Sequence, residues 1–285
     1  MYNGVILCAA MEYTEVVQNF VLDHKIGLSV AVSVGVVLWG IRRYVKGPRY
    51  YGKRRIDGKT VIITGGNTGI GKETAIDLAK RGAKVIIACR DMTRGNNAVG
   101  DIKRLSGSTN VSMVQLDLAS LKSVRKFAEE IHKTEKRLDI LINNAAGQLN
   151  FDDIAKRERY YNAEEAYTQS KLCNILFTKE LASRLSGTGV TTYSLHPGAI
   201  DTELGRHWRS KQRLIREPIY FIYSLFTKTP YEGALTNIYC AVDESLDKET
   251  GKYYSDCAEK APSKPALDEG AAKKLWELSE KLVGL

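Results

Sequence analysis

The sequence lacks the cysteine and histidine patterns of a metal site or a disulfide framework. Its 5 cysteines are scattered without a CxxC pair, and its 4 histidines show no spacing typical of metal ligands. These absences predict reduced thiols and no structural metal. Disorder is also excluded as the general state, because 285 residues with 44% hydrophobic content can bury a sizeable core.

Charge is absent from one long stretch near the N-terminus. Residues 26–41, IGLSVAVSVGVVLWGI, contain no charged side chain, and no acidic residue interrupts the basic cluster that follows between Arg42 and Arg55. These 16 residues are slightly fewer than the ~17–25 of a membrane-spanning helix, so an anchor lengthened by its flanks competes with a buried core helix. Trp39 near the end of the run and the arginines after it favour the anchor.

A clear small-residue cleavage site is also missing before the basic cluster, which argues against a cleaved signal peptide. We therefore expect an N-terminal segment over 1–25, an anchor helix over 26–41, a basic linker over 42–57 and one domain over 58–285. The positive-inside rule places the domain on the cytosolic side of an endoplasmic-reticulum-type membrane, and a mitochondrial membrane remains the alternative. Because the basic cluster supplies much of the +9 net charge, we expect no nucleic-acid partner.

From Lys59 onward, short runs rich in β-branched residues alternate with helix-length segments. The predicted parallel, buried strands are 60–64, 84–89, 111–116, 138–143 and 190–195, and the predicted helices lie near 70–81, 94–105 and 120–135. This alternation predicts an α/β fold with a doubly wound parallel sheet of the Rossmann type.

The last third of the chain is less regular. Residues 251–256 are expected to form a final strand and residues 268–284 a closing helix. The aromatic run PIYFIYSLF, residues 218–226, is compatible with a packed core helix, with a lid over a substrate and with a helix that touches the membrane.

A glycine-rich turn, TGGNTGIG at residues 64–71, follows the first predicted strand and opens a helix. Glycines there let the backbone approach a pyrophosphate, whose charge is held by the free N–H groups of the helix N-terminus. The strand before the turn and the helix after it indicate a dinucleotide site. The predicted cofactor-binding residues of the turn are Gly65, Asn67, Thr68, Gly69, Ile70 and Gly71.

No acidic residue stands at the tip of the second predicted strand. An acidic side chain there would bind the ribose 2′-hydroxyl of NAD and repel a 2′-phosphate. The tip is instead Cys89 followed by Arg90, whose guanidinium can pair with a phosphate, which predicts NADP(H) unless Arg90 is a solvated arginine beside Asp91. Asp117, with Leu118 after it, follows the third strand and is placed either to meet the adenine or to cap its own loop.

Tyr167 and Lys171 stand four residues apart on a predicted helix and therefore share one face of it. A tyrosine, with an ordinary pKa near ~10, needs a neighbouring cation to act as an acid or base near neutral pH, and Lys171 can provide one. Such a pair is usually a surface pair, but after a dinucleotide fold it indicates a catalytic site.

Taken together, four motifs resemble the short-chain dehydrogenase/reductase family: TGxxxGxG at 64–71, NNA at 143–145, YxxxK at 167–171 and HPGAIDTEL at 196–204. Finer runs such as ACRDMTRG, LDLASLKSVRKFA and LWELSEKLVGL resemble the membrane-anchored retinol dehydrogenases, most closely the retinol dehydrogenase 13 type. The resemblance covers about residues 40–285.

By this resemblance Tyr167 would be the general acid/base, and Lys171 would lower its pKa and hold the nicotinamide ribose. The reaction would be hydride exchange between NADP(H) and a hydrophobic alcohol or aldehyde, typically retinol and retinal. Further residues implied at the cofactor are Asn143 and Ala145 along its border and Pro197, Gly198 and Thr202 against the nicotinamide and its phosphates.

The family's catalytic serine and helical asparagine are missing. No serine or threonine occurs between Thr134 and Thr168, and 19 residues separate Gly147 from Tyr167. A crossover to a new parallel strand takes a dozen or more residues, and that strand with its exit loop needs about as many again. About fifty family residues, including a central strand, are therefore predicted to be missing near 146–147.

Two consequences follow from the predicted deletion. The strands on either side of it must pair with each other or leave backbone groups unpaired, and the oligomeric state is open because the missing helix contributes to the family's dimer interface. The chain is then either an NADP(H)-dependent oxidoreductase or a membrane-anchored NADP-binding protein with little or no catalysis.

Overall fold

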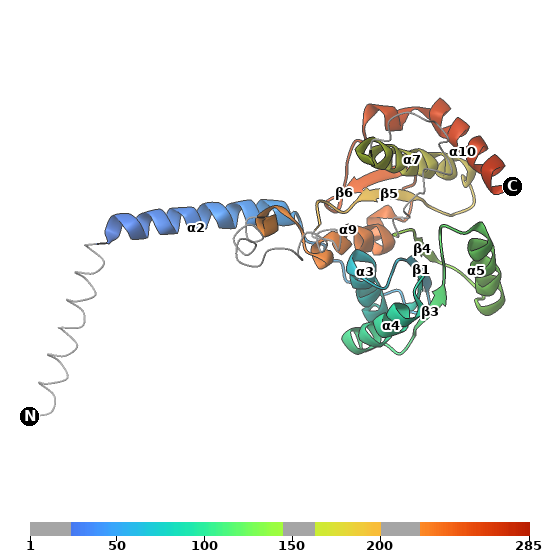
Figure 1. The fold of residues 1–285 in the computed structure, drawn as a ribbon, viewed down its shortest axis with the longest axis horizontal. Coiled ribbons are helices and arrows are strands. Elements are labelled where there is room, and N and C mark those ends of the chain that lie inside the picture. Colours follow the sequence, from blue (N-terminus) through green and yellow to red (C-terminus); the bar gives the residue numbers. More distant parts are fainter. Residues whose placement is uncertain (1–23, 145–162, 201–222) are drawn as a thin grey trace, which may run out of the picture.

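Two β-sheets and their helices make up the part of the chain that the computed structural model describes, residues 24–144, 163–200 and 223–285 (Figure 1). The first half contains α2 (Lys25–Lys46), β1 (Thr60–Thr64), α3 (Gly69–Lys80), β2 (Lys84–Cys89), α4 (Met92–Ser106), β3 (Val111–Gln115), α5 (Leu121–Thr134) and β4 (Ile140–Ile142). The second half contains α7 (Ala163–Arg184), β5 (Tyr193–His196), α9 (Pro230–Val242), β6 (Lys252–Ser255), β7 (Ala258–Glu259) and α10 (Glu269–Val283).

The first sheet is parallel with the strand order β3-β2-β1-β4, as the alternation of strands and helices predicts. All of β1 is buried, because its β-branched side chains pack on both faces of the sheet. Val61 and Ile63 join a core with α3, α4 and α9 on one face, whereas Ile62 packs with Ile131 of α5 on the other. Helices on both faces make this half doubly wound.

The sheet is divided where the sequence predicts a missing strand. Within the described residues β4 pairs with β1, while β5 pairs with β6 in a separate sheet of order β5-β6-β7, so β4 and β5 do not pair with each other. The parallel strand predicted over 138–143 is present as β4, but the prediction that it is buried is wrong, because Leu141 at its centre is 51% exposed. A strand at the open side of a sheet lacks the neighbour that would bury it.

Two other predicted strands are less buried than expected. In β3 only Val111 is buried, because β3 is the opposite edge of the first sheet, and in β5 only Ser194 is buried. The final strand and the closing helix are confirmed as β6 and α10, and a two-residue strand, β7, adds an antiparallel hairpin to β6.

Helix α9, which the sequence does not predict, joins the two halves (Figure 1). It packs against α3 as well as against β5 and β6. The buried Asn237 donates a hydrogen bond from Nδ2 to Thr74 Oγ1 at 3.4 Å, and Ala234 and Ile238 belong to the core of the first sheet. The second half is therefore held on the first by α9 rather than by a continuous sheet.

Helix α2 extends away from the domain and has no buried residue (Figure 1). Among the described residues it is the one helix whose length and composition would allow it to cross a membrane. It runs past Ile41 to Lys46, so the first cations of the predicted linker are helical. The end of that linker is packed on the domain, because Ile56 belongs to the core of the first sheet.

The described part of the aromatic run, residues 223–226, is helical and leads towards α9. Tyr223 and Phe226 are both exposed, so the alternative of a packed core helix is wrong for these residues. The residues before Tyr223 lie outside the described residues.

Candidate cofactor and active site

The glycine-rich turn is tightly packed against the strand ends around it. Gly65 N donates to Ala88 O at 2.7 Å, which ties the turn to β2. A Cβ on Gly71 would lie 2.5 Å from Gly65 O and 2.6 Å from Asn144 Nδ2. Gly65 and Gly69 have φ of 65° and 55°, a region that side chains rarely enter. Gly71 thus lets the start of α3 pack closely on the turn, whereas at Gly69 nothing in the described part of the chain lies within 4 Å of an added Cβ, so a ligand can approach the backbone there.

Asn144 holds the turn, whereas the sequence predicts its neighbours Asn143 and Ala145 at the cofactor. Asn144 N donates to Thr64 Oγ1 at 3.0 Å, and Asn144 Nδ2 donates to Thr64 O at 3.2 Å and to Gly65 O at 3.4 Å. The exposed Asn143 directly follows β4, and Ala145 lies outside the described residues. The pair Asn143–Asn144 after the strand indicates an asparagine at this site, but the sequence does not show which of the two side chains faces the turn.

The N-terminus of α3 begins in the glycine-rich turn and is suited to an anion. Its N-cap residue, Thr68, makes no side-chain capping hydrogen bond, and its first turn holds no acidic side chain. Unpaired N–H groups and the positive end of the helix dipole therefore point towards the turn. This is the arrangement that binds pyrophosphates.

Arg90 is exposed at the tip of β2, and within the described residues no ion pair of its side chain is found. Asp91 caps α4 by accepting from Arg94 N at 3.0 Å, and its other oxygen lies 3.7 Å from Arg94 Nε. The acidic neighbour is thus engaged by Arg94 rather than by Arg90. Cys89 is buried, and burial raises the pKa of its thiol.

Asp117 acts as a loop cap in this structure. Its Oδ1 accepts from Ala119 N at 3.1 Å, and its own backbone N donates to Ser123 Oγ at 3.0 Å. These bonds support the loop-capping alternative. They do not test a contact with adenine, because the second carboxylate oxygen of Asp117 could make that contact while Oδ1 caps the loop. Leu118 beside it is exposed.

The segment after β5 is held beside the glycine-rich turn by the first turn of α9. Gly198 N donates to His196 Nδ1 at 2.9 Å, directly after Pro197. A Cβ on Gly233 of α9 would clash with Ile200 and lie 3.4 Å from Ile70 Cγ1. Two predicted cofactor segments are therefore brought together across Gly233. Thr202 lies outside the described residues.

Tyr167 and Lys171 both belong to α7, which packs against β5, β6 and α10. Lys171 is exposed, and the side chain of Tyr167 lies outside the described residues. A hollow of about 430 Å³ next to α7 and β6 is lined by Ile175 and Tyr253 and by none of the predicted site residues. That hollow therefore does not coincide with the predicted site.

Gly71→Ala is expected to cost about 2 kcal/mol of unfolding free energy, because the new methyl group would overlap Gly65 O and Asn144 Nδ2. It should also weaken the binding of a nicotinamide dinucleotide, since the turn must open to accept the methyl. Thermal unfolding and titration of NADPH fluorescence measure the two effects. The matched control is Gly100→Ala on α4, where nothing lies within 4 Å of the added Cβ; equal losses in both variants would contradict the role of the turn.

The chain is similar to known proteins both in sequence and in fold. The short chain dehydrogenase family profile matches residues 59–163. Retinol dehydrogenase 13 of Mus musculus is 40% identical over 310 residues, covering 88% of this chain and 92% of the relative. Retinol dehydrogenase 14 of Homo sapiens is 37% identical, covering 90% and 97%.

The alignment with the mouse relative also contains many gap positions in this chain. Since 88% of 285 residues is about 250, an alignment of 310 positions sets roughly 60 positions of the mouse relative opposite gaps in this chain. This total is large enough to contain the roughly fifty missing residues that the motif spacing predicts, while a single deletion at 146–147 stays a prediction.

Solved structures share the fold. An uncharacterized protein from Mycobacterium Paratuberculosis has a TM-score of 0.61 at 27% identity, covering 81% of this chain and 95% of that one. The RhlG/NADP active-site complex of Pseudomonas aeruginosa has a TM-score of 0.57, covering 72% and 97%, and at 23% identity it supports the fold alone. With relatives matched over most of their length, the chain belongs to the short-chain dehydrogenase family, and the relatives that establish this are named retinol dehydrogenases.

Proposed function

We propose that this chain binds NADP(H) and belongs to the oxidoreductases that exchange hydride with a hydrophobic alcohol or aldehyde of the retinoid or lipid type. The glycine-rich turn held by Asn144 is the observation that carries the proposal. Gly65 and Gly69 have positive φ, and within the described residues nothing lies within 4 Å of a Cβ built on Gly69, so the turn fits a group whose phosphates approach the backbone. The retinoid substrate is inferred from the names of the relatives.

Each predicted residue has a distinct task in this proposal. The N–H groups at the start of α3 would hold the pyrophosphate, and Arg90 would pair with the 2′-phosphate that distinguishes NADP from NAD. The bound nicotinamide supplies or accepts the hydride. Tyr167 would pass a proton to or from the substrate oxygen, and Lys171 would favour the ionised form of that tyrosine by its charge.

A second function is supported by the division of the sheet between β4 and β5. The chain would then be a membrane-anchored NADP-binding protein with little or no catalysis, because the family's substrate-positioning serine is missing from the sequence between Thr134 and Thr168. The first half, which carries the glycine-rich turn, is complete in either case. The two functions therefore share cofactor binding and differ in turnover.

Turnover is tested by NADPH-dependent reduction of all-trans-retinal by the purified full-length chain in detergent. The Tyr167→Phe variant is the matched negative control, since it removes only the hydroxyl group of the proposed acid/base. A rate above that of the variant supports the oxidoreductase. Rates that are equal, with NADPH binding intact in both proteins, support the second function.

Arg90→Asp is expected to weaken NADPH binding at least about tenfold, because it replaces a partner of the 2′-phosphate with a like charge, and hydrogen bonds to charged groups contribute ~1.5–3 kcal/mol. NADH binding should be unchanged or stronger, since an aspartate can accept from the ribose 2′-hydroxyl. Titration of both dinucleotides by fluorescence measures the ratio. The matched control is Arg94→Asp, one turn away on α4; an unchanged NADPH/NADH ratio for Arg90→Asp would remove Arg90 from this role.

A further inference from the structure

The C-terminal end of α2 is fixed to the domain by ion pairs. Arg42 donates from one guanidinium nitrogen to Thr227 O at 2.8 Å and from the other to Glu232 Oε2 at 3.0 Å. Lys46, one turn further, lies 3.7 Å from Glu232 Oε1. Arg42 and Lys46 therefore both reach one carboxylate of α9.

Glu232 is built into the domain rather than exposed on its surface. It is buried in the capping box at the start of α9, where it accepts from Thr229 N at 2.9 Å. Burial alone would raise the pKa of Glu232, but the backbone N–H of Thr229 and the Arg42 guanidinium hold it below the ordinary value. A rigidly held, ionised carboxylate thus faces α2.

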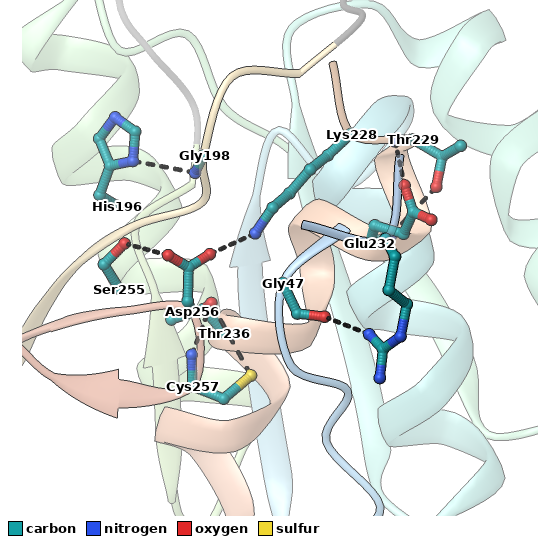
Figure 2. Close-up of polar contacts among 11 residues, drawn as sticks. Gly47, His196, Gly198, Lys228, Thr229, Glu232, Thr236, Ser255, Asp256 and Cys257 are labelled. Atoms are coloured by element: carbon teal, nitrogen blue, oxygen red, sulfur yellow. Dashed lines mark hydrogen bonds and ion pairs between the residues drawn. The ribbon is translucent and has the colours of Figure 1, made fainter. Parts of the chain in front are cut away.

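A second contact follows directly after α2. Figure 2 shows Gly47 beside the ion pair between Lys228 and Asp256. A Cβ on Gly47 would lie 3.1 Å from Asp256 Oδ1 and 3.3 Å from Lys228 Nζ. The chain leaving α2 therefore meets the domain at once, and α2 is a docked helix rather than a helix on a free tether.

Large aromatic side chains are exposed around this docking point. On α2, Trp39 is 70% and Tyr44 is 88% exposed. On the domain, Phe226 is 55% and Tyr231 is 51% exposed, and each is the chain neighbour of a residue that Arg42 contacts. In Figure 1 the segment before α9 lies against the C-terminal end of α2. The aromatics of both segments thus belong to the residues next to the point where α2 leaves the domain.

We propose that these residues form a membrane-contact face of the domain, defined by Trp39, Tyr44, Phe226 and Tyr231, which lies in the lipid headgroup layer. The inference rests on the proposed anchoring of the chain by α2. If α2 crosses the bilayer, its docking on Glu232 sets the face against the membrane surface. Tyrosine and tryptophan prefer the membrane interface, and the exposed Arg43 and Arg49 nearby suit anionic lipids.

This face also lies beside the segment that carries the predicted nicotinamide contacts. Lys228 N donates to Ala199 O at 2.7 Å, in the segment that follows the predicted nicotinamide contacts Pro197 and Gly198. A hydrophobic substrate dissolved in the bilayer would therefore meet the domain on the side that carries these residues. A docked α2 maintains that orientation, whereas a free tether would not.

The test is photocrosslinking of the full-length chain in vesicles of phosphatidylcholine and phosphatidylserine. Benzoylphenylalanine replaces Phe226 or Tyr231, and the matched control replaces Leu105, an exposed apolar residue of α4. Lipid adducts, measured by mass spectrometry, are expected at 226 and 231 at several times their level at 105. If the protein resists carbonate extraction but the adduct yields at 226 and 231 are no higher than at 105, the proposed membrane-contact face is wrong.

The ion pairs are tested in the same chains. Arg42→Glu sets a carboxylate against Glu232 and should lower the adduct yield at 226 about fivefold, the factor that corresponds to a modest ion pair. Adding Glu232→Gln, which keeps a side chain able to complete the capping box, should restore part of the yield by removing the repulsion. An unchanged adduct yield in Arg42→Glu would contradict the docking of α2 through Glu232. Release of the parent chain from membranes by carbonate would instead refute anchoring by α2.

Discussion

Restoring a helix–strand segment of about fifty residues between Ala146 and Gly147 is expected to raise the rate of NADPH-dependent retinal reduction at least about 100-fold. Removal of one positioned hydrogen-bond donor costs a factor of ~10²–10³ in other enzymes, and here the strand that would carry the donor is predicted to be missing as well. The divided sheet is the structural reason, because β4 and β5 belong to separate sheets within the described residues. A strand between them would place α7 on one continuous sheet with the glycine-rich turn.

The inserted segment can be taken from retinol dehydrogenase 13 of Mus musculus, which is 40% identical to this chain. Single-turnover and steady-state rates with all-trans-retinal are compared for the parent and the restored chain. The matched control is the restored chain with the serine of its new strand changed to alanine, which should lose most of the gain. NADPH should bind similarly to all three proteins, because the first half is unchanged; equal turnover by parent and restored chains would refute the argument from the missing segment.

The first half could be predicted from sequence because its signals are local. The run TVIIT forms β1 as predicted, and α3 begins at Gly69, inside the predicted glycine-rich turn. The choice between Asn143 and Asn144 could not be made, because it depends on which side chain faces Thr64, 80 positions earlier in the chain. Local patterns identify a strand and its loop, but they leave the direction of each loop side chain open.

Burial and long-range contacts could not be predicted in the same way. LDILIN has the composition of a core strand, and Leu141 is nevertheless exposed, because burial requires a neighbouring strand that the described structure does not contain. Arg42 and Glu232 are 190 positions apart, and each has an ordinary explanation by itself, as a membrane-flanking cation and as a helix cap. The sequence therefore predicts an anchor helix and a domain, but it cannot predict that the end of this helix is docked on the domain.

Asp256→Asn is expected to lower the free energy of unfolding by about 3 kcal/mol, the lower end of the ~3–5 kcal/mol measured when one partner of a buried ion pair is removed. Lys228 has a side chain only 7% exposed and pairs with Asp256, so the substitution leaves a buried ammonium group without its counter-charge. Asparagine is chosen because residue 256 has a φ of 55°, which asparagine tolerates better than alanine. Thermal or urea unfolding in detergent measures the loss.

Lys228→Met is the matched comparison and should cost clearly less than Asp256→Asn. The Asp256 side chain is 38% exposed, so it can be solvated when Lys228 is removed, whereas the buried Lys228 cannot be solvated when Asp256 is neutralised.

The ion pair between Lys228 and Asp256 also predicts that the stability of the protein depends on pH. Burial would raise the pKa of Asp256, but Lys228 holds it below the ordinary value, so the stabilisation is complete above the unfolded pKa of ~3.9 and is lost as the pH falls through the folded pKa. The difference between the parent and Asp256→Asn should therefore be constant near neutral pH and shrink below about pH 4; a difference that persists in acid would mean that the ion pair is not its source.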